Sequence, residues 1–222
     1  MQDKKEVRRE NLINIAINNT RKYAEEVSLN RSVPFVNDGL KPVARALAYV
    51  LYLYSDKLKN NKAFKSQDVC SSVIGKYHPH SMDSVYATAV KMVEEKGSIF
   101  ETSSTMSTKV TDSYSAPRYT NIKLSPLGRE LFSTIDLCEM VESEIDPNYK
   151  MPKTLLARFP YQLFNYSLNI GVGISNSQLP LNPKEVIEAF QFYLENKIKG
   201  EETKTEDLMK FIKGPDLYER TT

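Results

Sequence analysis

Tryptophan is absent from this 222-residue sequence, and cysteine and histidine occur only twice each. Cys70 and Cys138 lie far apart without metal-ligand or redox spacing, so ordinary reduced thiols are expected. No apolar run is long enough for a membrane span, and the N-terminal stretch MQDKKEVRRENL lacks a signal-peptide core. These absences argue against a disulfide scaffold and a membrane protein, and they predict a globular protein of the cytoplasm.

Charge is low overall but unevenly distributed. The net charge is +2, yet residues 1–100 hold 16 basic against 11 acidic side chains, whereas residues 101–222 hold 14 against 17. An excess of lysine often marks only a solvated face. The first half is nevertheless the better candidate for contact with a polyanion such as DNA.

The first 60 residues predict two helices and a connecting loop. Apolar residues recur at helical spacing over residues 5–27, which predicts an amphipathic helix within an N-terminal arm at residues 1–28. Prolines and the Asp38-Gly39 pair then indicate an extended loop and a turn. Pro42 suits the first turn of a helix that runs to residue 58.

Residues 66–125 predict a helix-turn-helix with a β wing. Ser66 is expected to cap a helix that ends at Gly75, and Ser81 to cap a second helix that stops at Gly97. The β-branched stretches 98–111 and 118–125 that follow have hairpin character. This is a winged-helix pattern, in which residues 83–92 would face a DNA groove. We therefore predict an α+β protein with a winged-helix domain at residues 29–140.

The remaining chain predicts the beginning of an α/β region at residues 141–222. A helix is expected over residues 125–141 from Pro126 onward. After a proline-rich extended segment, residues 167–179 read as a strand in which Gly171 and Gly173 allow a close backbone approach. Asn182 is a plausible cap for a helix over residues 183–198.

Both histidines fall in one stretch, IGKYHPHSMDSVY, directly before the second helix of the pair. Arginine meets phosphate oxygens bidentately, and histidine changes charge near neutral pH. A winged helix could gather six basic residues around one phosphodiester, although scattered surface cations are the alternative. The six are Arg31, Lys41, Arg45, Lys76, His78 and His80. The His-x-His pair lacks the further Cys or carboxylate ligands of a zinc set, so no metal ligand is assigned.

The dipeptide Arg118-Tyr119 is a weaker candidate for chemistry. A phenol with a pKa near 10 is a poor nucleophile at neutral pH unless a base or a cation assists it. Arg118 could stabilise charge at phosphorus, but in a strand the two side chains would point to opposite faces.

In their order and spacing, several motifs resemble the A-subunit, or breakage-reunion half, of the type IIA DNA topoisomerases. The motifs are RSVPFVNDGLKPVARAL, VIGKYHPH with SVY, PRYT, LARFPYQL and NIGVGISNSQLPLNPKEVIEA, and they cover most of residues 29–190. The combination of DGLKPV with GKYHPH is highly specific to that family.

The resemblance implies a role for each matching residue. Tyr119 would attack a DNA phosphodiester and hold the 5′ phosphate covalently, with Arg118 as its transition-state partner. Arg31, Lys41, Arg45, His78 and His80 match positions that line the cleaved phosphate, with Lys76 beside them, and Ile170 matches an isoleucine that wedges between base pairs.

The resemblance also implies the assembly and its cofactors. Mg²⁺ would be held mainly by the TOPRIM domain of a gyrase B-like partner, whose ATPase would bind ATP. Two copies of this chain would join two partner subunits around double-stranded DNA. The family's remaining tower, coiled coil and lower dimer gate would lie beyond this sequence, so we expect a split or truncated subunit.

Some positions depart from the family pattern. Ser81, Met82 and Asp83 replace the common Gly-Asp-Ser, and Ala87 stands where an acidic residue is usual, at positions where quinolones bind. Ala44 and Ala46 replace two basic residues, and ETSSTMSTKVTDS replaces a glycine-rich loop. The SAPRY motif is closer to eukaryotic and phage members, which predicts a divergent, phage-like enzyme in a bacterial or host cytoplasm.

Three other functions compete with this interpretation. A catalytically inactive DNA-binding fragment of such an enzyme would explain the altered loop, but not the retained Arg118, Tyr119 and histidines. A winged-helix transcription factor would leave the motif series unexplained. A tyrosine recombinase would need a His-x-x-Arg box, which the sequence lacks.

Overall fold

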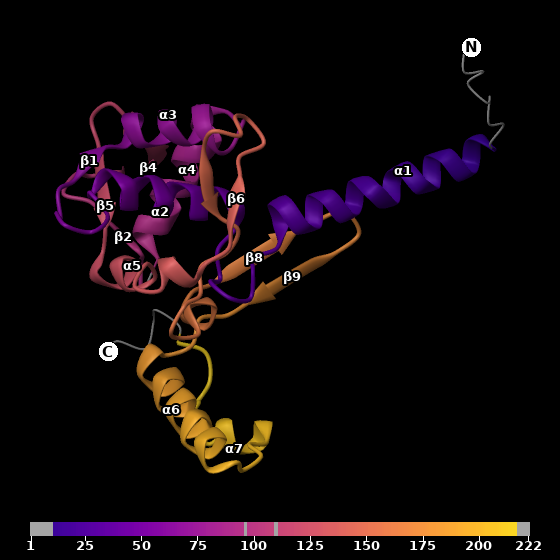
Figure 1. Cartoon of the computed structure of the whole chain (residues 1–222), viewed down its shortest axis with the longest axis vertical. Helices are drawn as coiled ribbons and strands as arrows, with labels where there is room; N and C mark the ends of the chain where they lie inside the picture. The colour runs from indigo at the N-terminus through magenta and orange to yellow at the C-terminus, as the bar shows by residue number, and fades with distance from the viewer. Residues whose placement is uncertain (1–10, 96, 109–110, 217–222) are drawn as a thin grey trace.

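The N-terminal helix projects away from the rest of the molecule. The structure, a computed structural model, describes residues 11–95, 97–108 and 111–216. Helix α1 spans Leu12–Val27, begins at Asn11, whose side chain accepts a hydrogen bond from the Ile13 amide, and has no buried residue. It continues into a π-helix at Ser28–Ser32, where an extended loop was predicted. Figure 1 shows α1 reaching outward as a single rod. Residues 5–10 of the predicted helix lie outside the described residues.

Three helices form the centre of the main body. Helices α2 (Pro42–Tyr54), α3 (Ser66–Lys76) and α4 (Met82–Glu94) pack against one another. Every residue of α2 from Ala44 to Tyr52 is buried, as expected for a helix enclosed on several sides. Ser81 caps α4 as predicted, its hydroxyl accepting from the Ser84 amide at 3.3 Å.

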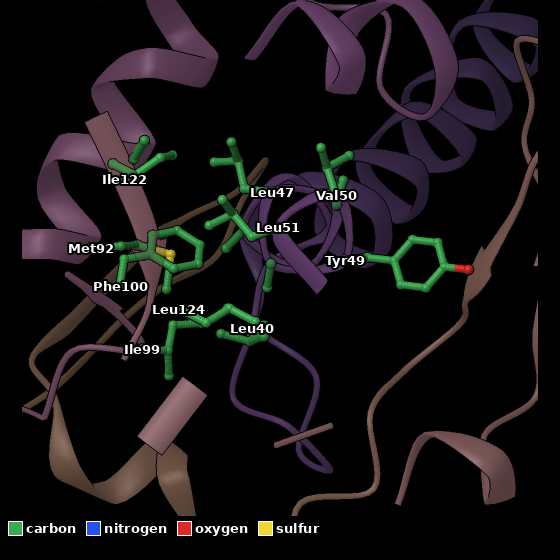
Figure 2. Close-up of a cluster of buried hydrophobic side chains, with 14 of the residues drawn as sticks. Leu40, Leu47, Tyr49, Val50, Leu51, Met92, Ile99, Phe100, Ile122 and Leu124 are labelled. Carbon is green, nitrogen blue, oxygen red and sulfur yellow. The ribbon is translucent and has the colours of Figure 1, made fainter. Parts of the chain in front are cut away.

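A small antiparallel sheet closes one side of these helices. Its order is β1 (Phe64–Lys65), β5 (Asn121–Leu124), β2 (Phe100–Glu101), with Phe64 opposite Ile122 and Phe100 opposite Leu124. Figure 2 shows Leu47 and Leu51 of α2 pointing toward Phe100, Ile122 and Leu124. Full burial of each such side chain contributes about 1.5–3 kcal/mol. The sheet and helices therefore share one core.

In the sequence, a separate hairpin lies between β2 and β5. It pairs β3 (Ser107–Thr108) with β4 (Thr111–Tyr114), and Lys109 and Val110 of the predicted wing lie outside the described residues. The chain order is thus helix, strand, two helices, strand, hairpin, strand. This mixture of helices and small sheets confirms the predicted α+β class.

The second half of the chain contains short elements and two further hairpins. Helix α5 (Pro126–Glu130) and a 3-10 turn (Ile135–Leu137) lead to β6 (Met140–Glu142), which pairs with β7 (Lys150–Pro152). A 3-10 turn at Tyr161–Phe164 precedes β8 (Ser167–Ile170), which pairs with β9 (Ser175–Gln178). Helices α6 (Pro183–Lys199) and α7 (Thr205–Leu208) follow, with Asn182 capping α6 as predicted.

Several other local predictions were wrong. Residues 125–141 are not one helix, because Leu131 and Phe132 turn into the core and Met140–Glu142 pairs as a strand. Residues 167–179 are two strands joined by a turn rather than one strand. Gly75 lies inside α3, and Lys65 rather than Ser66 occupies its N-cap. The proposed domain boundaries remain predictions, and no helix within the described ranges has the length and apolar character to cross a bilayer.

Candidate phosphate-handling site

Arg31, His78 and His80 meet at one place. Arg31 lies in the last turn of the π-helix, and the histidines lie in the turn between α3 and α4. The Arg31 Nη2 atom is 2.8 Å from His80 Nε2, and the two imidazole rings stack with centroids 3.8 Å apart. All three side chains line a cavity of about 330 Å³ together with Asn30 and Ser81. The structure thus brings together three of the six basic residues that the sequence grouped, and their role stays a prediction.

The electrostatics of this cluster suit an incoming anion. Burial, and then the neighbouring His80 and Arg31, lower the pKa of His78 to about 4, so its ring is neutral at pH 7. His80 Nδ1 is buried with no hydrogen-bond partner among the described residues. A phosphate group close to His78 would favour the charged form of that ring. The cluster thus brings a guanidinium and a neutral imidazole to the wall of one cavity.

Lys41 and Lys76 do not line the cavity that holds Arg31 and the two histidines. Lys76 ends α3, and its Nζ lies 5.0 Å from the centre of the Tyr149 ring. Lys41 precedes α2 and lines another cavity, together with Lys91 and Glu95. Burial and the nearby Lys91 lower the pKa of Lys41, while Glu95 opposes that shift. Lys41 thus lines a different cavity from the one that holds both histidines.

Arg45 is almost completely buried beside Asp38, and its contact with DNA stays a prediction. Its side chain is 2% exposed, and its Nε donates to Asp38 Oδ2 at 2.6 Å. Asp38 also accepts from the amides of Leu40 and Leu155 and from the Thr154 hydroxyl. Arg45 also lines a cavity of about 400 Å³ together with Arg31, His78 and His80. Arg45 fixes the turn that places Lys41 and the start of α2.

The Arg118-Tyr119 pair lies in a turn before β5, not in a strand as predicted. The Tyr119 amide donates to the Ala116 carbonyl at 2.9 Å, and the Arg118 Cζ atom lies 4.6 Å from the centre of the Tyr119 ring. Tyr119 is 73% exposed, so its phenol is open to a substrate. Neither side chain lines the cavities that contain His78.

Buried hydroxyls hold this turn on the helical body. Tyr86 of α4 donates to the Ser115 carbonyl at 2.7 Å and lies 3.0 Å from Thr120 Oγ1. Thr120 in turn donates to Ser66 Oγ at 2.8 Å, and the Ser66 amide donates to the Thr120 carbonyl. The residues on both sides of Tyr119 are thereby fixed, while its own side chain stays exposed.

Ile170 lies far from these groups along the chain, at the tip of the β8-β9 hairpin. It is 67% exposed, and the adjoining turn is closed by a hydrogen bond from the Gly171 amide to the Ile174 carbonyl. The hairpin extends on the same side of the body as α1 (Figure 1). An apolar side chain presented in this way is available to a partner surface.

Sequence reasoning missed two positioning residues. Asp38 is visible as the acid seven residues before Arg45, but only the structure shows that the pair is buried. Tyr86 lies within the SVY motif, yet its link to the Tyr119 turn spans 34 residues to Thr120. In the described part of the chain, no group of three or more His, Cys, Asp or Glu side chains could hold a metal ion.

Comparison with known proteins gives a consistent result. Residues 31–222 match the family model for the A subunit of DNA gyrase/topoisomerase IV. The chain is 35% identical over 205 residues to the DNA gyrase A subunit of Mycolicibacterium smegmatis, covering 88% of this chain and 23% of the relative. It is 32% identical over 220 residues to that of Borreliella burgdorferi, covering 94% and 26%. The chain thus spans about a quarter of the length of these relatives.

Proposed function

This chain belongs to the family of DNA gyrase/topoisomerase IV A subunits, and on that premise we propose that it is the DNA cleavage and religation part of a type IIA topoisomerase. The observation that carries this proposal is the exposed side chain of Tyr119, which lies on a fixed turn with Arg118 against its ring. The Arg31, His78 and His80 cluster supplies cationic and proton-carrying groups for a DNA phosphate.

The proposed reaction is a transesterification. The Tyr119 phenol oxygen attacks phosphorus, a new O–P bond forms to the 5′ phosphate, and the P–O3′ bond breaks. The proton lost by the phenol is balanced by the proton gained by the 3′ oxygen. In this proposal Arg118 and Arg31 stabilise the extra negative charge on the phosphate oxygens in the transition state, and His80 transfers a proton. Religation is the reverse of this step.

The arrangement of elements supports a winged-helix interpretation of residues 29–140. The order α2, β1, α3, α4, β2, hairpin, β5 and the sheet order β1-β5-β2 are those expected when two strands flank a wing. In this proposal α4 faces the DNA groove, the exposed Ile170 wedges between base pairs, and residues 141–222 begin the tower.

The proposed assembly includes a partner protein. Double-stranded DNA is the substrate, and two copies of this chain combine with two gyrase B-like subunits. Following the family resemblance, we assign Mg²⁺ mainly to the TOPRIM domain of the partner and ATP to the partner's ATPase. A DNA-processing role places the complex in the cytoplasm of a bacterium or of a phage-infected host.

The test is a covalent-adduct experiment. The chain is incubated with a gyrase B-like protein, supercoiled DNA and Mg²⁺, then denatured rapidly, and protein linked to DNA is measured. Adduct is expected from the wild type and not from Tyr119→Phe, because the attacking oxygen is removed. Tyr114→Phe is the matched control, since Tyr114 is another exposed tyrosine nearby and should leave the adduct intact.

Two outcomes would count against the proposal. Persistent adduct with Tyr119→Phe would assign the nucleophile elsewhere. DNA binding by the wild type without any adduct would instead favour a catalytically inactive DNA-binding fragment.

A further inference from the structure

The tip of the β8-β9 hairpin lies against the residue that ends α1. A Cβ atom added at Gly171 would lie 3.2 Å from Ser28 Oγ and 3.0 Å from Ile174 Cγ1, so the backbone of the tip approaches both residues closely. Figure 1 shows the hairpin beside the end of α1 that joins the main body. The Ser28 hydroxyl therefore lies next to the turn that directly follows Ile170.

The two glycines of this tip lack a side chain for different reasons. Gly173 has a φ of 77°, which favours glycine, and an added Cβ there would meet no described atom within 4 Å. Gly171 lies outside the left-handed region, so its missing side chain serves the close approach to Ser28 instead. The close backbone approach that the sequence predicted for this stretch is thus found at Gly171.

The backbone of Ser28 is held on both sides. Its amide donates to carbonyls in the last turn of α1. Its own carbonyl accepts from the Val33 amide at 3.2 Å, which closes the π-helix Ser28–Ser32. Such wide helical turns are rare and often mark functional sites. The Ser28 hydroxyl is therefore presented to the hairpin from an ordered backbone.

The same π-helix reaches the cluster that we propose as a DNA phosphate contact. Arg31 lies in its last turn, and the Arg31 Nη2 atom is 2.8 Å from His80 Nε2. On the other side, Ile170 directly precedes Gly171 and is 67% exposed. One segment of five residues thus meets the hairpin tip through Ser28 and the histidine cluster through Arg31. This segment sets where Ile170 lies relative to the cluster.

The hairpin needs support from the rest of the molecule. In the described part of the chain, β8 and β9 form a sheet of two strands that pair with each other alone. A two-stranded hairpin is only marginally stable by itself. At the base of the hairpin, Gln178 Nε2 donates to the Gln162 carbonyl at 2.8 Å. Ser28 supplies a contact at the opposite end, where Ile170 is presented.

We propose that Ser28 is a positioning residue for Ile170. This inference rests on the proposed function, in which Ile170 wedges between base pairs of a bound duplex. The contact between Ser28 and Gly171 holds the hairpin tip so that Ile170 enters the duplex while Arg31 contacts a phosphate. If the tip is displaced, the phosphate contacts stay in place and the duplex is bent less.

DNA bending by variants of this contact tests the proposal. Energy transfer between dyes at the two ends of a duplex measures the bend imposed by the full chain with a gyrase B-like protein. Gly171→Ala should lower the equilibrium constant for bending about tenfold, because its methyl group pushes the tip away from Ser28. Duplex affinity, measured by fluorescence anisotropy, should stay nearly unchanged because phosphate contacts dominate it.

A second substitution at Ser28 should reverse this loss. Ser28→Ala in the Gly171→Ala chain removes the Oγ atom that the new methyl group meets, so bending should be restored. Ser28→Leu alone crowds the same contact from the side of α1 and should lower bending as Gly171→Ala does. Circular dichroism checks that each variant is folded.

The matched control is Ser177→Ala in the Gly171→Ala chain, which removes a hydroxyl from the exposed strand β9 and should not restore bending. Equal rescue by the two serine substitutions, or unaltered bending by both Gly171→Ala and Ser28→Leu, overturns the proposal. A wild type that bends the duplex no more than Ile170→Ala also overturns it, since no wedge then needs positioning. Because bending is measured apart from the covalent adduct, a wild type that bends DNA without forming adduct would count against the cleavage proposal alone.

Discussion

At the scale of single residues, His78 links stability to pH. Its pKa is about 4 in the folded chain, against an ordinary value of about 6.5, because burial, His80 and Arg31 disfavour its charge. Between these two values the unfolded chain binds more protons, so the free energy of unfolding falls as the pH is lowered through this window. Because the ring is partly exposed, we expect a discounted loss of about 1 kcal/mol between pH 7 and pH 5.

Urea unfolding of the wild type and of His78→Gln at pH 7 and pH 5 measures this effect. The variant should lose about 1 kcal/mol less than the wild type over this interval. Between pH 7 and pH 8 the two proteins should behave alike, since the ring is mostly neutral in both states there. An identical pH response of the two proteins below pH 6.5 would contradict the assignment.

Arg45 shows what sequence alone does not determine about a residue. Its position directly after the motif DGLKPVA predicted a contact with DNA. The clustering of Arg31 with the two histidines was likewise predicted from motif positions in the sequence. The difference is Asp38, which accepts from Arg45 at 2.6 Å in a fully enclosed position. Removing one partner of a buried ion pair costs about 3–5 kcal/mol because the other charge is left unpaired. The pair therefore holds the turn, and a neighbouring lysine is left to face solvent and ligand.

At the scale of elements, two glycines illustrate opposite constraints. Gly39, before α2, has a φ of 66°, and a Cβ there would lie 2.8 Å from the Gln162 Cα atom. Gly75 lies within α3, and an added Cβ would meet nothing within 4 Å. We expect Gly39→Ala to destabilise the fold by more than about 1 kcal/mol, and Gly75→Ala to stabilise it by about 0.5–1 kcal/mol.

Thermal unfolding of the two variants provides the measurement, with each serving as the control for the other. Gly39→Ala should lower the melting temperature, and Gly75→Ala should raise it. A stabilising Gly39→Ala would mean that the turn before α2 is not packed against Gln162, and the argument that it positions Lys41 would fail.

The same elements show how far the sequence predicts the fold. Local sequence signals predicted where α2, α4 and α6 begin, because Pro42, Ser81 and Asn182 mark the starts of these helices. A helix was predicted over residues 125–141 from Pro126 onward, but β6 pairs with β7 about ten residues later and gains a ladder of hydrogen bonds. The Arg118-Tyr119 turn was wrongly predicted as part of a strand for a similar reason. The hydrogen bonds that hold this turn involve Ser66, Tyr86 and Thr120.

At the scale of the whole molecule, the cations that we propose as DNA contacts lie in the half of the sequence with the excess of basic side chains. The basic first half supplies Arg31, Lys76, His78 and His80, which belong to the region from the π-helix to the turn before α4. Residues 101–222 carry more acidic than basic side chains, and α6 and α7 lie at the opposite end of the molecule from α3 (Figure 1). A duplex should therefore be held at the α3-α4 end, mainly through its phosphates.

Salt dependence of duplex binding tests that placement. Each cation that neutralises a phosphate adds about 0.9 to the slope of log affinity against log salt concentration for B-form DNA. We expect Lys76→Gln, at the end of α3, to weaken binding of a fluorescent duplex and to reduce the slope by about 1. Lys199→Gln, at the end of α6, removes the same charge from the other end of the molecule and should leave both unchanged. Equal effects of the two substitutions would mean that net charge, rather than a defined face, governs the contact with DNA.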